Sequence, residues 1–129
     1  MNLFTYGTLM FPEVWHRIDV GDFPSEPATL PGFAIYRVKD AVFPGMVRAE
    51  PDSHVEGIVY RDLTDDALFE LDAYESDFYD RIPVIAAGQH GLIDCTAYVV
   101  PNSHRSALTN QPWSREWFAE HQLERYLNG

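Results

Sequence analysis

The chain has 129 residues, 46% of them apolar and 14% aromatic. This length favours a single domain over residues 1–129, and the apolar content favours a folded globule over a disordered chain. With 20 acidic and 9 basic residues, the formal net charge is −11, which repels nucleic acid and anionic membranes. No apolar run approaches the roughly 20 residues of a membrane span, and no signal-peptide pattern opens the chain. We therefore expect a cytoplasmic protein without nucleic acid or membrane partners.

The first thirty residues predict a strand, a short helix and a long loop. Leu3 to Thr8 is rich in aromatic and β-branched residues and predicts a short strand that stops at Gly7. Pro12 suits the first turn of a helix, where its missing N–H is not needed. The stretch from Gly21 to Pro31 contains three prolines, and we expect a loop with little regular structure there.

The next segment predicts two strands separated by a turn. Phe33 to Lys39 and Val55 to Tyr60 are rich in aromatic and β-branched residues, which favour strands. Between them, Pro44 and Gly45 follow Phe43, and this pair is typical of a turn. Gly57 lies inside the second strand, where a glycine indicates a bulge or a close approach of another backbone.

The clearest helix begins after Thr64 and is expected over residues 65–78. Thr64 is a suitable N-cap, and the aspartates that follow it suit the positive end of the helix dipole. Leu63 and Leu68 have the spacing of a hydrophobic staple. Phe69 falls outside the apolar stripe, so the helix could be covered on two sides.

The last third predicts a β-hairpin and a final helix. Arg81–Ala87 and Leu92–Val100 flank a four-residue turn that begins and ends with glycine. The final helix is expected after Ser114, with apolar positions spaced to cover a core: Ala119, Leu123, Tyr126 and Leu127. Several strands, few helices and no strict β-α-β alternation indicate an α+β fold with a mixed or antiparallel sheet that could close into a barrel.

Glu75 is the carboxylate most suited to acid/base chemistry. At about 100° per residue, it lies roughly 50° from the centre of the apolar face of the 65–78 helix. In an apolar, acid-rich environment the charged form is disfavoured, so its pKa should rise into the range useful for proton transfer. The alternative is a structural glutamate at the rim of the helix, with Arg81 as its salt-bridge partner.

Gly7 is the second candidate. A glycine that leaves a strand can adopt a positive φ and expose successive backbone N–H groups to an anion. Thr8 adds a hydroxyl donor. The alternative is an ordinary turn without a ligand.

Other kinds of site receive no support from the pattern of residues. The five histidines have no metal-ligand spacing, and no glycine-rich nucleotide-binding motif occurs. We therefore expect neither a metal nor a cofactor. Cys95, the only cysteine, lies in a predicted strand, where a packed thiol is favoured over a nucleophile.

Taken in order, several short motifs resemble the gamma-glutamylcyclotransferase-like family, which includes AIG2-like proteins and gamma-glutamylamine cyclotransferases. The resemblance extends from the first residues to about Tyr98. The motifs are Tyr6-Gly7-Thr8-Leu9, Phe43-Pro44-Gly45, Val55-x-Gly57-x-x-Tyr60, Leu71-Asp72-x-Tyr74-Glu75 and Tyr79-x-Arg81.

This resemblance implies a small mixed β-barrel with flanking helices and a cavity. It also implies an enzyme of the acyltransferase or lyase type, which cyclises a gamma-glutamyl compound and releases 5-oxoproline and an amine. Glu75 takes the position of the acid/base. The Tyr6, Gly7, Thr8 and Leu9 segment takes that of the substrate-binding loop. Tyr79 and Arg81 would line or brace the site, with a purely structural Arg81–carboxylate pair as the alternative.

Two functions from different classes remain open. One is a cyclotransferase acting on a small gamma-glutamyl substrate, and the other is a catalytically silent binding or scaffold protein of the same fold. We further expect Gly21–Pro31 and the region from Trp113 to Phe118 to border the cavity and select the leaving amine, because loops commonly carry specificity. Alternatively, Trp113 and Trp117 anchor the last helix.

Overall fold

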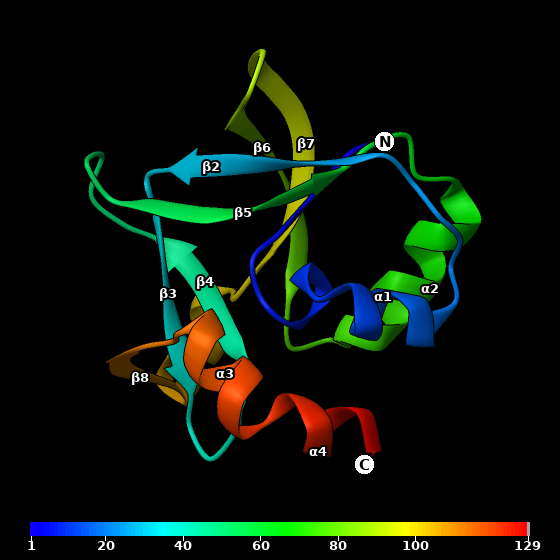
Figure 1. Cartoon of the computed structure of the whole chain (residues 1–129). Coiled ribbons are helices and arrows are strands. Elements are labelled where there is room, and N and C mark those ends of the chain that lie inside the picture. Colours follow the sequence, from blue (N-terminus) through cyan, green and yellow to red (C-terminus); the bar gives the residue numbers. More distant parts are fainter. Residues whose placement is uncertain (129) are drawn as a thin grey trace.

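The computed structural model describes residues 1–128, and its centre is a closed five-stranded barrel (Figure 1). The strand order is β1-β5-β2-β6-β7. Neighbouring strands are antiparallel except β1 and β7, whose parallel pairing of Leu3 with Thr96 closes the barrel. The strands are β1 (Leu3–Thr5), β2 (Ser25–Pro31), β5 (His54–Tyr60), β6 (Asp80–Gly88) and β7 (Gly91–Val99).

A second, three-stranded sheet lies beside the barrel. Its order is β4-β3-β8, with both pairs antiparallel. The strands are β3 (Phe33–Val38), β4 (Pro44–Arg48) and β8 (Leu108–Pro112). The expected α+β fold with a small mixed barrel is therefore confirmed.

Short helices flank the barrel at one end and along the second sheet (Figure 1). The longest is α2, whose N-cap Thr64 accepts a 3.1 Å hydrogen bond from the amide of Ala67, as expected. Within residues 1–128 no helix is both long and apolar enough to cross a membrane. The helices are η1 (Thr8–Met10), α1 (Pro12–Ile18), α2 (Asp65–Glu75), η2 (Asn102–Ala107), α3 (Arg115–His121) and α4 (Leu123–Asn128).

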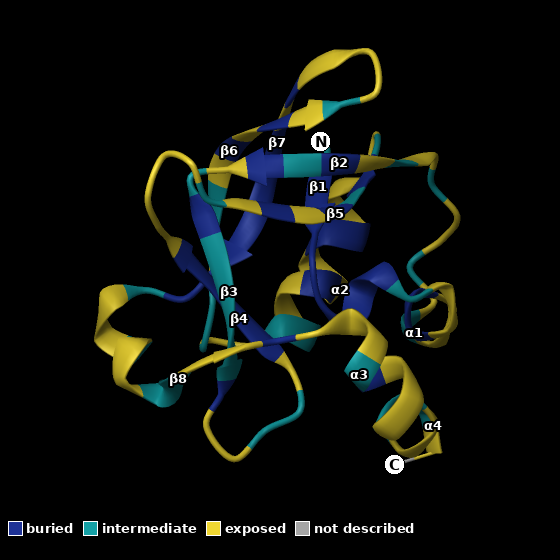
Figure 2. Ribbon diagram, turned by 60° about the vertical axis from the view of Figure 1, so that its left-hand side comes forward, coloured by how far each residue is buried: buried dark blue, intermediate teal, exposed yellow. Residues whose placement is uncertain are grey.

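Two clusters of buried apolar residues support this arrangement. Figure 2 shows the buried strands in contrast to the exposed tip of the β6–β7 hairpin and the exposed C-terminal helices. The first cluster fills the barrel and includes Phe4, Leu30 and Val59. The second lies between the barrel and the first two α-helices. It includes Leu63 and Leu68, the two residues expected to form a hydrophobic staple.

Some local predictions were wrong. Residues 25–31 form strand β2, although Gly21–Pro31 was expected to be a loop. Pro44 and Gly45 belong to β4 instead of forming a turn. Both errors come from proline, which strands tolerate where no ladder hydrogen bond is required.

Helix limits and faces also differ from expectation. Helix α2 ends at Glu75, three residues early, because Ser76 has a positive φ of 69°, which cannot continue a right-handed helix. Phe69 is 73% exposed, so α2 is not covered on its second side by the described residues. Ala119 is exposed, and the side chain of α3 that is fully buried is Phe118.

Candidate functional site

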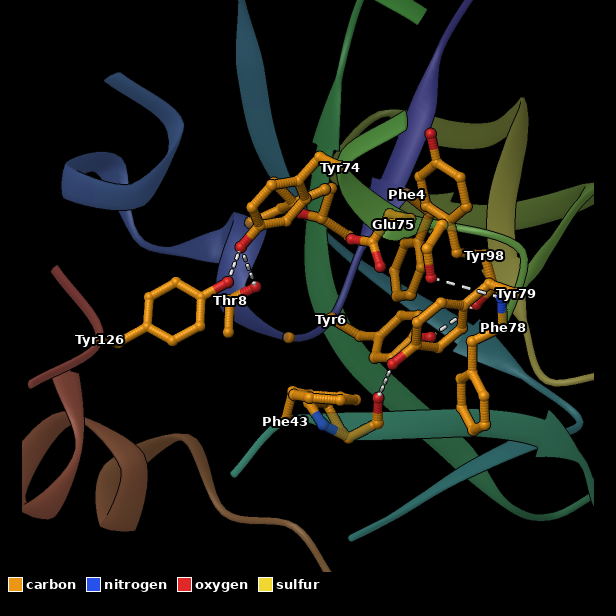
Figure 3. Close-up of a pocket in the computed structure, with 15 residues that line it drawn as sticks. Phe4, Tyr6, Thr8, Phe43, Tyr74, Glu75, Phe78, Tyr79, Tyr98 and Tyr126 are labelled. Atoms are coloured by element: carbon orange, nitrogen blue, oxygen red, sulfur yellow. Dashed lines mark hydrogen bonds between the residues drawn. The ribbon is translucent and has the colours of Figure 1, made fainter. Parts of the chain in front are cut away.

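A pocket of about 170 Å³ opens at the end of the barrel near η1 and the C-terminus of α2 (Figure 3). Its walls are mainly aromatic, and Glu75 is the one carboxylate among the described residues that line it. The lining comes from segments that are distant in sequence: Phe4, Thr5, Tyr6, Gly7, Thr8, Leu9, Phe43, Pro44, Tyr74, Glu75, Ser76, Phe78, Tyr79, Tyr98 and Tyr126. The fold thus brings together the predicted Tyr6–Leu9 segment, Glu75 and Tyr79.

Glu75 is the last residue of α2, and its carboxylate points among the aromatic rings (Figure 3). Burial raises the pKa of Glu75 to about 7, because the charged form loses its hydration there. No Lys, Arg or His side chain lines the pocket within residues 1–128, so no positive charge there offsets this loss. Near neutral pH the carboxyl group can therefore both accept and release a proton.

The segment from Tyr6 to Leu9 leaves β1 and turns into η1 at the floor of the pocket. The first N–H groups of such a helix have no partner within it, so Thr8 and Leu9 can offer their amides to a ligand. Gly7 has a φ of −120°, so the expected positive φ was wrong. Glycine is required there for another reason: a Cβ at this position would lie 2.9 Å from Cγ of Pro44.

Tyrosine hydroxyl groups connect the pocket wall to its surroundings. The Tyr79 hydroxyl donates to the carbonyl of Pro44 at 2.7 Å, and the Tyr6 hydroxyl donates to the carbonyl of Tyr98 at 2.6 Å. Burial, reinforced by the nearby Glu75 carboxylate, raises the pKa of Tyr79 well above its ordinary value. These phenols therefore stay protonated and neutral at physiological pH.

Arg81 does not line the pocket. Its guanidinium group contacts both carboxylate oxygens of Asp72, at 2.8 and 3.2 Å. Asp72 also accepts a 2.7 Å hydrogen bond from the hydroxyl of Tyr98, whose side chain does line the pocket. Burial alone would raise the pKa of Asp72, but the hydrogen bonds from Arg81 and Tyr98 lower it. The expected alternative, a salt bridge between Arg81 and Glu75, was therefore wrong. The structural pair of Arg81 with a carboxylate does form, and its partner is Asp72.

The two segments expected to border this cavity lie elsewhere, so that expectation was wrong. No residue of Gly21–Pro31 or of the Trp113–Phe118 region lines the pocket. Both contribute instead to a separate, wider groove of about 930 Å³. Trp113 is buried, and its indole N–H donates to the carbonyl of Val42 at 2.8 Å. Trp113 therefore fits the alternative expectation, in which it anchors the C-terminal helical segment.

Six aromatic side chains of the pocket were not among the candidate site residues: Phe4, Phe43, Tyr74, Phe78, Tyr98 and Tyr126. Phe43 and Tyr74 belong to the motifs that carry the family resemblance, and Phe78 falls at the end of the helix expected over residues 65–78, but no local pattern assigns any of the three to a pocket. Tyr126 has the spacing of a core residue on the last helix, and no local signal reveals that this helix reaches the pocket. Among residues 1–128, no group of three or more His, Cys, Asp or Glu side chains could hold a metal ion.

An aromatic pocket in a small barrel, with one carboxyl group of raised pKa, has the chemistry suited to binding a small molecule and exchanging a proton with it. Residues 3–118 match the family model described as "Gamma-glutamyl cyclotransferase, AIG2-like". The chain belongs to this family.

Relatives in Arabidopsis thaliana support the assignment. AIG2-like protein C is 33% identical over 132 residues, covering 98% of this chain and 73% of that protein. AIG2-like protein A is 36% identical over 83 residues, covering 64% of this chain and 50% of that protein. The chain therefore spans about half the length of the second relative.

Solved structures share the fold. A solution structure of an Arabidopsis thaliana protein superposes with a TM-score of 0.75 at 26% identity, covering 98% of this chain and 85% of that one. A protein named gamma-glutamyl cyclotransferase superposes with a TM-score of 0.63 at 23% identity, over 78% of this chain and 66% of that chain. At that identity the second likeness concerns the fold alone.

Proposed function

We propose that this protein is a gamma-glutamyl cyclotransferase, which cyclises a gamma-glutamyl amine or amino acid to 5-oxoproline and releases the free amine. The observation that carries the proposal is Glu75, a carboxyl group with a pKa of about 7 in a pocket that also contains the Tyr6–Leu9 segment. Family membership supports the same reaction class. The substrate is a small molecule, and the chemistry requires no cofactor.

In the proposed reaction, the substrate's own α-amino nitrogen attacks its γ-amide carbon. A new C–N bond closes a five-membered lactam, and the bond from that carbon to the departing amine breaks. Glu75, in its ionised form, takes the proton that the attacking nitrogen loses. It then gives this proton to the departing nitrogen and returns to its ionised form. One carboxyl group with a pKa near the working pH is suited to both transfers.

The pocket would also lower the entropic barrier. The reaction is intramolecular, so holding the glutamyl chain folded back on itself supplies much of the rate enhancement. We assign this role to the Tyr6–Leu9 segment, in which the amides of Thr8 and Leu9 and the Thr8 hydroxyl would bind the α-carboxylate. The neutral phenol of Tyr79 also lines the pocket and is held by its hydrogen bond to the carbonyl of Pro44.

The test is direct. The purified protein is incubated with a panel of gamma-glutamyl amines and amino acids, and 5-oxoproline is quantified by liquid chromatography. Release by the wild-type protein, lost in Glu75→Gln, supports the enzyme. Tight binding by calorimetry without 5-oxoproline release from any member of the panel would favour the alternative, a catalytically silent binding or scaffold protein.

A further inference from the structure

The C-terminal helix α4 contributes to the pocket although it lies beyond residues 3–118, the part of the chain that matches the family model. Tyr126 of α4 lines the pocket and its hydroxyl group is hydrogen-bonded to that of Tyr74 (Figure 3). The Tyr74 hydroxyl is in turn 3.1 Å from Oγ1 of Thr8. Three hydroxyl groups therefore form a chain from α4 to the Tyr6–Leu9 segment.

The ring of Tyr126 is held in place by packing. It makes an edge-to-face contact with Phe118, with ring centroids 5.7 Å apart. Phe118 is fully buried and also contacts the rings of Phe11 and Trp113. The hydroxyl of Tyr126 is thus presented to Tyr74 from a fixed position, although α4 itself has no fully buried residue.

The direction of the hydrogen bonds determines what Thr8 can offer a ligand. A hydroxyl group has one proton to donate, and a carboxylate can only accept. If Tyr126 donates to Tyr74, the Tyr74 proton is directed to Thr8, and the Thr8 proton remains free to point into the pocket. In the opposite direction, Thr8 spends its proton on Tyr74 and presents only lone pairs. A bound carboxylate therefore selects the first direction, and successive bonds in such a chain strengthen one another.

We propose that Tyr126 is a positioning residue, which acts through Tyr74 to orient the Thr8 hydroxyl as a donor to the α-carboxylate of a gamma-glutamyl ligand. This inference rests on the proposed function for the identity of the ligand. It adds α4 to the working site and assigns Tyr126 no direct role in proton transfer.

The first experiment compares Tyr126→Phe with a control variant, Tyr36→Phe. The control also removes one tyrosine hydroxyl group, but from a residue of β3 that does not line the pocket. Binding of L-gamma-glutamyl-n-butylamide is measured by calorimetry in a Glu75→Gln background, where no turnover disturbs the titration. We expect Tyr126→Phe to weaken binding about five- to tenfold, as for a lost hydrogen bond that supports a charged group. Tyr36→Phe should change it less than about twofold.

Two further measurements separate positioning from general structural damage. Tyr74→Phe should weaken binding as well, and adding Tyr126→Phe to it should have no further effect, because the chain is already broken. The ligand 4-aminobutanoyl-n-butylamide lacks the α-carboxylate, so Tyr126→Phe should leave its weaker binding unchanged. Thermal unfolding of each variant checks that the fold is retained.

The outcomes distinguish the two proposals. Equal affinity of Tyr126→Phe and Tyr36→Phe for the glutamyl ligand would overturn the role of Tyr126, whatever the activity. So would equal losses with both ligands, or additive losses in the double variant. Binding that depends on Tyr126 without 5-oxoproline release by the wild-type protein would sink the proposed reaction alone. Absence of any binding of the glutamyl ligand would overturn both.

Discussion

The hydroxyl group of Tyr79 donates a 2.7 Å hydrogen bond to the carbonyl oxygen of Pro44, which joins the barrel side of the pocket to the second sheet. The same proline limits the space at Gly7, where a Cβ would lie 2.9 Å from its Cγ. Pro44 therefore fixes two pocket segments at once. A change at Gly7 should affect both.

We predict that Gly7→Val abolishes binding of a gamma-glutamyl ligand or raises KM at least about tenfold. The added side chain must displace either Pro44 or the Tyr6–Leu9 segment, because interiors have little free volume to absorb it. Calorimetry and steady-state kinetics measure the effect, and thermal unfolding shows whether the fold survives.

A second-site variant gives the control for this steric account. Gly7→Ala places its Cβ against the Pro44 ring, whereas Pro44→Ala removes the Cγ and Cδ atoms that it meets. The double variant should therefore bind better than Gly7→Ala alone. A double variant that binds worse than either single variant would contradict the steric account, and unchanged binding by Gly7→Val would remove the Tyr6–Leu9 segment from the site.

Glu75→Gln should reduce 5-oxoproline release about 10²- to 10⁴-fold, the usual contribution of a general acid/base, while ligand binding is retained. The amide keeps the volume of the side chain but cannot exchange a proton. Glu70→Gln is the matched control, because Glu70 is exposed on the same helix and does not line the pocket. Wild-type turnover by Glu75→Gln would end the assignment.

The stability of the protein should depend on pH through the same residue. The folded-state pKa of Glu75 is raised, to about 7, so the folded protein holds this proton more tightly than the unfolded chain. The stabilisation of the folded state by this proton is fully present below the pKa of Glu75 in the unfolded chain. It is lost as the pH rises through about 7. Across this window the free energy of unfolding of the wild-type protein should fall by about 3 kcal/mol relative to that of Glu75→Gln. Urea unfolding of both proteins at pH 4.5, 6 and 8 measures the difference, and parallel curves would show that Glu75 is not desolvated.

Arg81 should act through Asp72 and not through the ligand. The pair is partly exposed, with 24% of the Arg81 side chain and 44% of that of Asp72 accessible, so Arg81→Gln should cost about 1 kcal/mol or less of unfolding free energy. We expect Asp72→Ala and Arg81→Gln to change KM in parallel and non-additively, since both act on Tyr98. An Arg81→Gln variant that loses ligand binding while Asp72→Ala keeps it would make Arg81 a ligand-binding residue.

The parts of the fold that could be predicted from sequence are those set by local chemistry. Thr64 caps α2 because a side-chain oxygen and a free amide are three residues apart. The hairpin of β6 and β7 turns at Gly88 and Gly91, as expected, because their strands carry clear patterns on both sides. The position of Glu75 on α2 followed from helical periodicity in the same way.

The parts that sequence did not reveal depend on tertiary context. β2 pairs with β6 only at Ala28 and Thr29, so Pro27 and Pro31 fall outside that ladder and a strand tolerates them. The positive φ of Ser76 ends α2 where the apolar pattern would continue to Phe78. The arrival of Tyr126 at the pocket depends on how α3 and α4 pack, which no spacing within those helices specifies.

The parallel contact of β1 with β7 has a consequence for how the pocket comes into being. Its floor follows directly from β1, and β1 is held by strands whose partner residues lie more than fifty positions further along the chain. Contacts of such long range form late and cooperatively, because the intervening chain must first be ordered. A nascent or partly unfolded chain therefore has no binding site to offer. Any ligand of the pocket binds only the fully closed barrel, and it stabilises the whole protein against global unfolding by an amount that grows with the logarithm of the ligand concentration above Kd.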